Sequence, residues 1–214
     1  LTLLAAYING AAVTPVISEA GLTCTVPAGA FIWQCEVEIN PSANTELSGL
    51  YMSNGMYCTQ CEAEGFRRIT YYPDRPDVMA PFDVTIHSDL PYALSNGEPM
   101  RSEGTTRRWQ DPWPKPAYLF ALVAGEFKVV SDHFTTASGK PVDLNIYVRD
   151  GDQDKCAFAL EALKASMAWD ERIYGREYDL SVFNIVAVDD FNMGAMENKG
   201  LNIFNSSAVL ASPE

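Results

Sequence analysis

The residues with the clearest chemical potential lie in a polar stretch that contains glycine, Val188 to Gly200. The small residues Gly194 and Ala195 stand at its centre, and Glu197 follows two positions later. Small residues allow a second extended backbone to approach closely. Backbone pairing at an exposed strand edge gives affinity that tolerates many sequences, and a carboxylate beside it can meet a positive group on the ligand. The stretch therefore indicates a peptide-binding edge, and the alternative is a turn with a solvated carboxylate.

Other patterns that carry chemistry are weak in this sequence. His87 and His133 belong to no HExxH or similar helical pair, so the chain alone cannot form a histidine-rich zinc site. Cys58 and Cys61 form a CxxC pair, for which a redox pair, half a zinc site and ordinary thiols are the alternatives. The redox alternative predicts a reactive thiol of low pKa. The sequence contains no G-x-S-x-G, P-loop or G-x-G-x-x-G motif.

Composition narrows the class of protein. The 214 residues are 47% hydrophobic and 20% charged, which is ordinary globular usage and predicts a folded chain with a real core. Fifteen basic against 28 acidic residues give a net charge of −13, which disfavours nucleic acid and anionic membranes as partners. The longest apolar run, Tyr118 to Gly125, is too short to span a bilayer. The odd number of cysteines, five, favours a reducing compartment, and we expect the cytoplasm.

Short extended segments separated by turns fill the chain to about residue 126 and predict a β-sandwich. Phe31 to Ile39 alternates apolar and mostly polar residues, as does Phe82 to His87, so each should be a half-buried strand. Arg108 to Pro116 is excluded as a central strand because its three prolines remove hydrogen-bond donors. Tyr118 to Ala124 reads as a fully buried strand. These features place a domain boundary near Gly125.

The second part of the chain combines predicted strands with one convincing helix. The patterns predict a hairpin, one helix that packs on a sheet, and two buried strands that flank the stretch described above: Glu126–Phe134 with Val142–Arg149, Asp154–Tyr174, Val182–Val188 and Leu201–Phe204. The helix rests on apolar residues at spacings of four, three and four, and Gly175 ends it. The chain begins without Met or a basic leader and stops without a closing element, so we expect both ends to be cut.

Three segments resemble one family of enzymes. Gly194-Ala195-Met196-Glu197-Asn198 matches the GAMEN exopeptidase motif of the aminopeptidase N family of zinc metallopeptidases. Residues 59–77 are similar to that family's second signature, and residues 110–125 are similar to the stretch that closes its N-terminal domain. The resemblance covers nearly the whole chain, is weakest before residue 40 and is closest to the bacterial alanyl aminopeptidase type. It implies a mainly β fold with some α: an N-terminal β-sandwich, residues 1–126, then the β-rich first lobe of a thermolysin-like catalytic domain, residues 127–214.

The resemblance also implies roles for particular residues. Glu197 and Glu62 would both bind the free α-ammonium of a peptide, and Met193 would line the pocket for its first side chain. Two carboxylates around one cation explain a preference for amino termini, because an internal peptide nitrogen would leave both acids uncompensated. The substrate-binding residues expected in the chain are Glu62, Met193, Gly194, Ala195, Met196, Glu197 and Asn198.

The same resemblance implies that the zinc-binding residues of the enzyme lie outside these 214 residues. The family's zinc ligands, two histidines of HExxH and a later glutamate, would fall beyond Glu214, so the expected chain holds no catalytic or metal-binding residue and is inactive alone. Its partners would be peptides with a free amino terminus and the remainder of the catalytic domain, in a protein taken to be a monomer. The alternative function is a non-catalytic peptide-binding or scaffold protein that recognises free amino termini.

Overall fold

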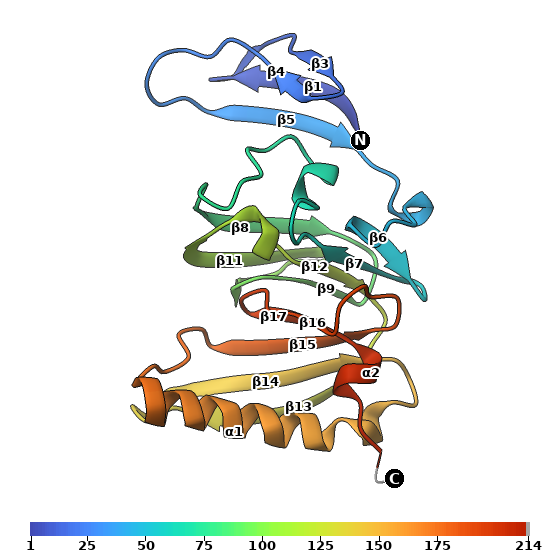
Figure 1. The fold of residues 1–214 in the computed structure, drawn as a ribbon, viewed down its shortest axis with the longest axis vertical. Coiled ribbons are helices and arrows are strands. Elements are labelled where there is room, and N and C mark those ends of the chain that lie inside the picture. Colours follow the sequence, from blue (N-terminus) through green and yellow to red (C-terminus); the bar gives the residue numbers. More distant parts are fainter. Residues whose placement is uncertain (213–214) are drawn as a thin grey trace.

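A thin antiparallel layer opens the chain and lies at the end of the molecule farthest from its long helix (Figure 1). The computed structural model describes residues 1–212. In this layer the central strand is β1 (Thr2–Ile8), which pairs with β2 (Ala11–Ala12) and β5 (Trp33–Glu38), and a hairpin joins β3 (Val16–Ser18) to β4 (Gly21–Thr23). The apolar residues of β5 are half-buried and its polar ones exposed, which confirms the predicted alternation from Trp33 to Glu38. Phe31 was expected on the same face, but it is 41% exposed and precedes the strand.

Two further sheets form the middle of the stack (Figure 1). One has the order β10-β11-β8, and the other has the order β6-β7-β12-β9. Their strands are β6 (Gly49–Ser53), β7 (Met56–Gln60), β8 (Ala80–His87), β9 (Tyr92–Ser95), β10 (Glu98–Pro99), β11 (Thr106–Lys115) and β12 (Leu122–Gly125). Short 3-10 turns connect the elements: η1 (Pro41–Ala43), η2 (Phe66–Arg68), η3 (Ala117–Leu119) and, later in the chain, η4 (Gln153–Lys155).

The proline-rich segment was wrongly excluded as a central strand, because β11 pairs with β10 on one side and β8 on the other. Pairing with β8 runs from Thr106 to Asp111 and resumes only at Lys115, opposite Ala80. Between the Asp111 and Lys115 pairs β11 advances four residues and β8 only two, so β11 forms a bulge. Pro112 and Pro114 lie in this bulge, where no backbone N–H is required for pairing with β8. The ladder therefore uses residues on both sides of these two prolines and leaves the prolines unpaired.

The prediction of one buried strand over residues 118–124 is also wrong in its first half. The chain makes the turn η3 and enters β12 only at Leu122. The Asn96 side chain bonds both ends of this bend, since it donates to the Leu119 carbonyl and accepts from the Ala121 N–H. The bend buries Phe120 in an aromatic cluster whose nearest ring, Phe66, is 5.1 Å away between centroids. The packing of Phe120 and the two hydrogen bonds of Asn96 therefore stabilise a bend where the apolar pattern predicts a strand.

The last layer is a five-stranded sheet with one face covered by the helix α1 (Figure 1). Its order is β13-β14-β15-β17-β16, from β13 (Lys128–Thr135), β14 (Pro141–Val148), β15 (Val182–Val188), β16 (Ala195–Met196) and β17 (Leu201–Asn205). The predicted hairpin and both predicted strands are confirmed. α1 (Ala157–Tyr174) confirms the predicted helix, which ends at Gly175 in a left-handed conformation. The short helix α2 (Ser206–Val209) follows β17.

Two apolar cores hold the five-stranded sheet between its neighbours. On the helix side, Leu160 and Met167 of α1 pack with buried residues of β14 and β15 such as Ile185. On the other side, alternate residues of β15 such as Val186 join Tyr51 of β6 in a core that also includes β7, β9 and β12. A continuous core therefore crosses the predicted boundary at residues 126 and 127, and the division into two domains stays a prediction. Within residues 1–212, no helix is long and apolar enough to cross a membrane.

Candidate peptide-binding edge

The Gly194–Glu197 stretch contains β16, the outermost strand of the five-stranded sheet. β16 pairs antiparallel with β17 through two residue pairs, Ala195 with Phe204 and Met196 with Ile203. The Gly194 carbonyl also accepts from the Asn205 N–H at 2.9 Å. Met196 is fully buried, so its side chain anchors the strand in the core and only its backbone can face a ligand. β16 thus has the position predicted for an edge at which another extended backbone can pair.

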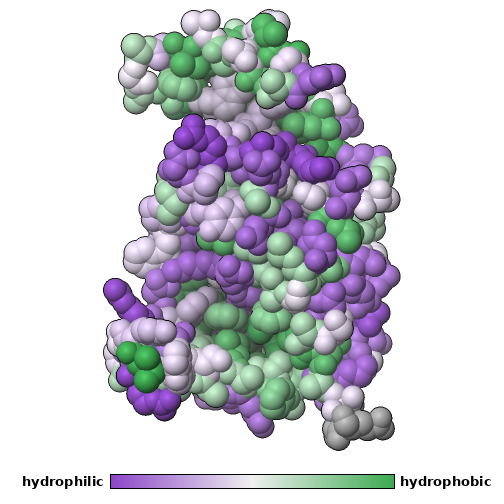
Figure 2. All heavy atoms as spheres, viewed as in Figure 1, coloured by the Kyte–Doolittle hydropathy of each residue, from purple (hydrophilic) through white to green (hydrophobic). Residues whose placement is uncertain are grey.

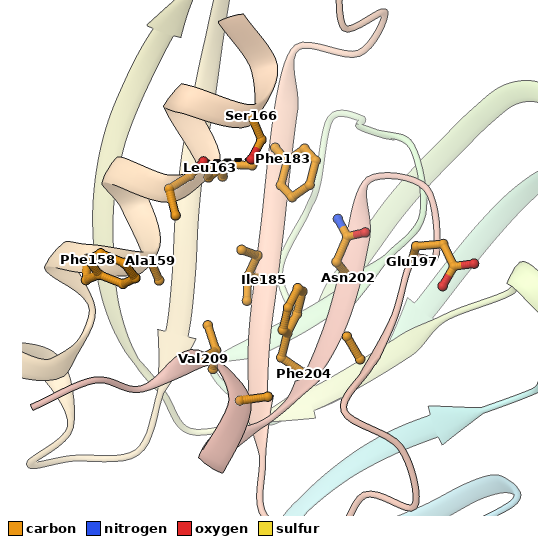
Figure 3. A pocket seen from close by; sticks show the side chains of 13 residues that line it. Phe158, Ala159, Leu163, Ser166, Phe183, Ile185, Glu197, Asn202, Phe204 and Val209 are labelled. Atoms are coloured by element: carbon orange, nitrogen blue, oxygen red, sulfur yellow. Dashed lines mark hydrogen bonds between the residues drawn. The ribbon is translucent and has the colours of Figure 1, made fainter. Parts of the chain in front are cut away.

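Space and charge at this edge suit a peptide end. No heavy atom lies within 4 Å of the position that a Cβ on Gly194 would occupy, and both Gly194 and Ala195 are exposed. Glu197 is exposed directly after the strand, and its carboxylate points away from α1 (Figure 3). Asn198 is 1% exposed, and its Oδ1 has no hydrogen-bond partner among the described residues. The edge therefore offers a backbone to pair with and a carboxylate to meet a cation.

An apolar groove of about 440 Å³ lies between α1 and this edge. Figure 2 shows apolar side chains gathered in a hollow on the face that carries α1. Ala195 and Glu197 line the groove on its β16 side. The large side chains that line it come from α1, β15 and β17: Phe158, Leu163, Phe183, Ile185 and Phe204 (Figure 3). The groove is thus continuous with the predicted site.

The segment that contains this edge, residues 189–200, is called the recognition segment below, and its first half is bonded to the β6–β7 hairpin. Tyr51 donates to the Asp190 carbonyl at 2.7 Å, and Ser53 both donates to the Asp190 carboxylate and accepts from the Asp190 N–H. Burial raises the pKa of the Tyr51 hydroxyl, which keeps it a donor. The Gln60 amide donates to Met193 Sδ at 3.1 Å. These contacts fix the entry to the edge from an earlier part of the chain.

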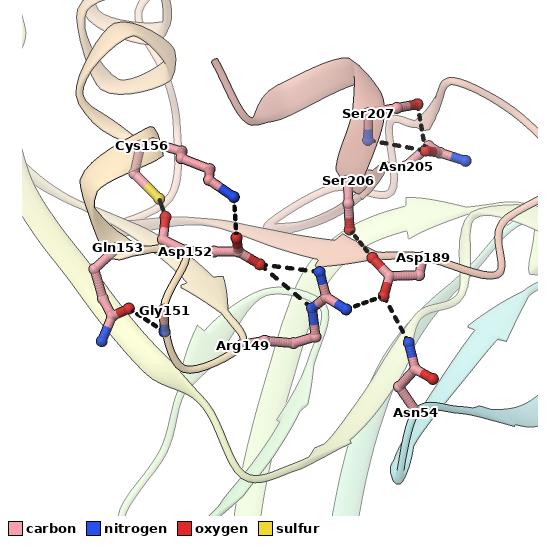
Figure 4. Close-up of polar contacts among 11 residues, drawn as sticks. Asn54, Arg149, Gly151, Asp152, Gln153, Cys156, Asp189, Asn205, Ser206 and Ser207 are labelled. Carbon is pink, nitrogen blue, oxygen red and sulfur yellow. Dashed lines mark hydrogen bonds and ion pairs between the residues drawn. The ribbon is translucent and has the colours of Figure 1, made fainter. Parts of the chain in front are cut away.

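Asp189 is the centre of a second polar network at the same entry (Figure 4). Its carboxylate accepts from Arg149 at 2.5 Å, from Asn54 at 2.6 Å and from Ser206 at 2.5 Å. Arg149 also pairs with Asp152 at 3.1 Å. One carboxylate therefore joins the end of β14, the β6–β7 turn and the start of α2 immediately before the recognition segment.

Glu62 is exposed in the loop that follows β7, and its peptide bond to Ala63 is cis. It lines a polar cavity of about 320 Å³ that also includes Arg67, Asp74 and Tyr118. This cavity shares no lining residue with the groove beside Glu197. Met193 contacts Gln60 at the end of β7, two residues before Glu62. The two predicted ammonium ligands, Glu62 and Glu197, nevertheless line different cavities. Their joint role stays a prediction.

The cysteine pair lacks the properties of a redox site. Cys58 and Cys61 are both buried, at 0% and 1% exposure, and neither forms a disulfide. Burial raises the pKa of Cys58 to about 12 and raises that of Cys61 as well. A reactive thiol needs the opposite shift, so these are structural thiols.

The residues that hold the recognition segment at its ends were not predicted from the sequence. Ser53, Asn96, Asp189 and Asp190 are single polar residues in turns or at strand ends, and no spacing or motif distinguishes them. Their partners lie far away in the chain, as with Ser53 and Asp190, which are 137 residues apart. Only the folded structure reveals these bonds.

An edge strand with an exposed carboxylate at its end has the features that peptide binding by strand addition requires, and comparisons with known proteins identify the family. Residues 21–119 match the peptidase M1 N-terminal domain, and residues 158–214 match the peptidase family M1 domain. The chain belongs to peptidase family M1.

Relatives with similar sequences or structures are named aminopeptidases. The chain is 56% identical over 200 residues to aminopeptidase N of Caulobacter vibrioides, covering 90% of this chain and 23% of the relative. It is 58% identical over 183 residues to aminopeptidase N of Escherichia coli, covering 81% and 21%. The crystal structure of Legionella pneumophila aminopeptidase A in complex with aspartic acid superposes with a TM-score of 0.92 at 34% identity, covering all of this chain and 26% of that one. The chain thus spans about a fifth to a quarter of the length of these relatives.

Proposed function

We propose that the whole protein is a zinc-dependent aminopeptidase and that this chain carries the part that recognises the free amino terminus of a peptide. The observation that carries the proposal is the placement of β16 at the outer edge of the sheet with the exposed Glu197 directly after it. Membership of peptidase family M1 supports the same reaction class, the removal of amino-terminal residues from peptides.

In this proposal the chain binds and orients the substrate. A peptide lies antiparallel to β16 and bonds its backbone through Gly194 and Ala195, where no side chain obstructs it. The Glu197 carboxylate meets the α-ammonium at the end of that strand, and Glu62 supplies a second carboxylate. Met193, 38% exposed and held by Gln60, contacts the first side chain, and its flexible thioether tolerates several shapes.

The residues described here do not fit a catalytic zinc ion. Within residues 1–212, no three histidine, cysteine or acidic side chains lie close enough together to hold a metal. The two histidines also lie apart, on β8 and β13. We propose that the chain by itself neither binds catalytic zinc nor hydrolyses peptides, and that zinc ligands come from other residues of the whole protein. The five free thiols support a reducing compartment, and we propose the cytoplasm.

The test is the kinetics of the whole protein with alanine p-nitroanilide and with its N-acetyl derivative, which lacks the ammonium charge. Glu197→Gln and Glu62→Gln keep the side-chain shape and remove one countercharge each. We expect each to lower kcat/KM for the free-amino substrate about 30-fold or more, because the bound ammonium then loses one of its two countercharges. Glu64→Gln is the matched control, because Glu64 is an exposed carboxylate in the same loop as Glu62.

Three outcomes separate the alternatives. Unchanged kinetics in both variants would contradict the roles of Glu197 and Glu62. A wild-type protein that binds alanine amide but hydrolyses nothing after zinc is supplied would favour the non-catalytic scaffold. Loss of activity in Glu64→Gln as large as in Glu62→Gln would show a general effect of charge in that loop.

A further inference from the structure

The far end of the recognition segment packs against the turn between β9 and β10. A Cβ on Gly200 would lie 2.8 Å from the Gly97 nitrogen, so the two turns are in backbone contact. Gly97 cannot retreat, because a Cβ there would lie 2.2 Å from the Gln110 carbonyl and 2.5 Å from the Asp111 Cα. The end of the segment therefore rests directly on the backbone of the middle sheets.

Asn96 joins these two turns by hydrogen bonds. Its side chain is 1% exposed, and its Nδ2 donates to the Lys199 carbonyl and to the Leu119 carbonyl, each at 3.0 Å. Its Oδ1 accepts from the Ala121 N–H at 2.7 Å. Both donors and the acceptor of the amide are thus occupied. Two of the bonds hold Asn96 within the middle sheets, and the third reaches the recognition segment.

The position of Lys199 is closely linked to that of Glu197. Asn198, between them, is buried, and its carbonyl accepts from the Leu201 N–H at 3.1 Å, so the backbone turns tightly here. The Lys199 side chain pairs with Asp179 at 2.8 Å. In the part of the chain that the structure describes, no hydrogen bond or ion pair holds the Glu197 carboxylate. Its location therefore depends on the backbone that Asn96 restrains.

We propose that Asn96 is a positioning residue for substrate recognition: by holding the Lys199 carbonyl it sets where the Glu197 carboxylate meets the substrate's ammonium. This inference rests on the proposed function of Glu197. A displacement of about 1 Å at a binding group can lower activity about 100-fold, so the loss of one buried hydrogen bond two residues away is measurable.

The test compares two variants of the whole protein. Asn96→Asp keeps the size and the acceptor for Ala121 but removes both donors, including the one to Lys199. Ser95→Ala is the matched control, because Ser95 is fully buried beside Asn96 and donates to the Ala121 carbonyl at 2.8 Å without a hydrogen bond to the recognition segment. Thermal unfolding of both variants measures their general loss of stability.

The decisive readout is selectivity between alanine p-nitroanilide and propionyl p-nitroanilide, which lacks only the amino group. We expect Asn96→Asp to lower kcat/KM for the amino substrate about tenfold or more and to lower the selectivity ratio by a similar factor, mainly through KM. Ser95→Ala should change the ratio less than about threefold. Hydrogen exchange in residues 189–200 should accelerate in Asn96→Asp alone. A merely structural role would change stability in both variants and leave the ratio unchanged.

If Asn96→Asp does not fold, Gly200→Ala gives the same test, because a Cβ at Gly200 displaces the same end of the segment while leaving Asn96 intact. Wild-type selectivity in a folded Asn96→Asp or Gly200→Ala protein would overturn the inference. A wild-type protein without aminopeptidase turnover would instead contradict the proposed function, so the two failures are distinguishable.

Discussion

The salt bridge between Lys115 and Asp111 is almost fully removed from solvent. The two side chains are 4% and 0% exposed, and Nζ lies 2.8 Å from Oδ2. The Trp113 N–H donates to the other carboxylate oxygen at 3.1 Å, and the Phe82 ring centroid is 4.1 Å from Nζ. Burial lowers the pKa of the Lys115 ammonium, although its bond to Asp111 opposes that shift. The pair spans the proline bulge of β11, so it tests how that strand accommodates its prolines.

Lys115→Met is expected to lower the free energy of unfolding by about 3–5 kcal/mol, because it leaves the Asp111 carboxylate buried with a single N–H donor. Asp111→Asn combined with Lys115→Met removes both charges, and the double variant should be more stable than the sum of the two single changes predicts. Urea unfolding of the chain, followed by tryptophan fluorescence, gives each free energy, provided that the dependence on urea concentration is unchanged.

The matched control is the exposed pair of Arg75 and Asp77. Its charged atoms lie 2.6 Å apart, closer than in the buried pair, but the side chains are 68% and 63% exposed. Exposed pairs contribute little because solvent screens them, so Arg75→Met should leave the urea midpoint unchanged. A midpoint for Lys115→Met within error of that for Arg75→Met would refute the reasoning from burial.

Two further predictions concern ionisable groups. Because burial raises the pKa of Cys58 to about 12, its thiol stays protonated at pH 8, so iodoacetamide should leave Cys58 unlabelled in the folded chain and label it in urea, as mass spectrometry of peptides will show. The pKa of Asp152 is lowered from its ordinary value of 3.8, chiefly by its bond to Lys155. Asp152→Asn should therefore destabilise the chain above about pH 4, and the difference in urea midpoint should disappear as the pH falls through the lowered pKa, where the wild-type carboxyl is also neutral; a pH-independent difference would contradict this.

The elements that could be predicted from the sequence are those whose burial repeats at short range. In α1, Leu160 and Met167 recur at helical spacing and are buried against the sheet, so the pattern and the packing agree. In β14, every second residue from Val142 to Val148 is fully buried, and the alternation was visible in the sequence. Such segments can be predicted without knowing what packs against them, because each has one apolar face that is buried in any fold.

The errors occurred where a distant partner determines the local structure. Pro112 and Pro114 argued against a central strand, but β8 pairs with the residues before them and leaves the prolines in a bulge. The apolar run from Tyr118 predicted a continuous strand, but Asn96 brackets a bend within it, 23 and 25 residues away from the groups it bonds. Neither partner can be identified from the segment itself.

The candidate site also combines a feature that is local in the sequence with contacts that are distant in it. Small residues followed by a carboxylate, as in Gly194 to Glu197, are a local feature, so a candidate edge could be proposed before its strand was known. Its role in peptide binding stays a prediction. Its supports are long-range: Tyr51 and Ser53 hold Asp190 across more than 130 residues, and Asn96 reaches Lys199 across 103. The chemistry of the edge is therefore encoded within a few residues, and its position is encoded throughout the chain.

The position of β16 depends on contacts to more than one sheet. β16 is joined to its own sheet by two residue pairs and by the bond from the Asn205 N–H to the Gly194 carbonyl, so contacts outside that sheet also contribute to its position. Besides its bonds to the five-stranded sheet, the recognition segment is held at both ends by the middle sheets, at the β6–β7 hairpin and at the β9–β10 turn. A shift of the middle sheets against the five-stranded sheet would therefore move the Glu197 carboxylate, so substrate selectivity should respond to substitutions in residues 49–97 that contact no substrate.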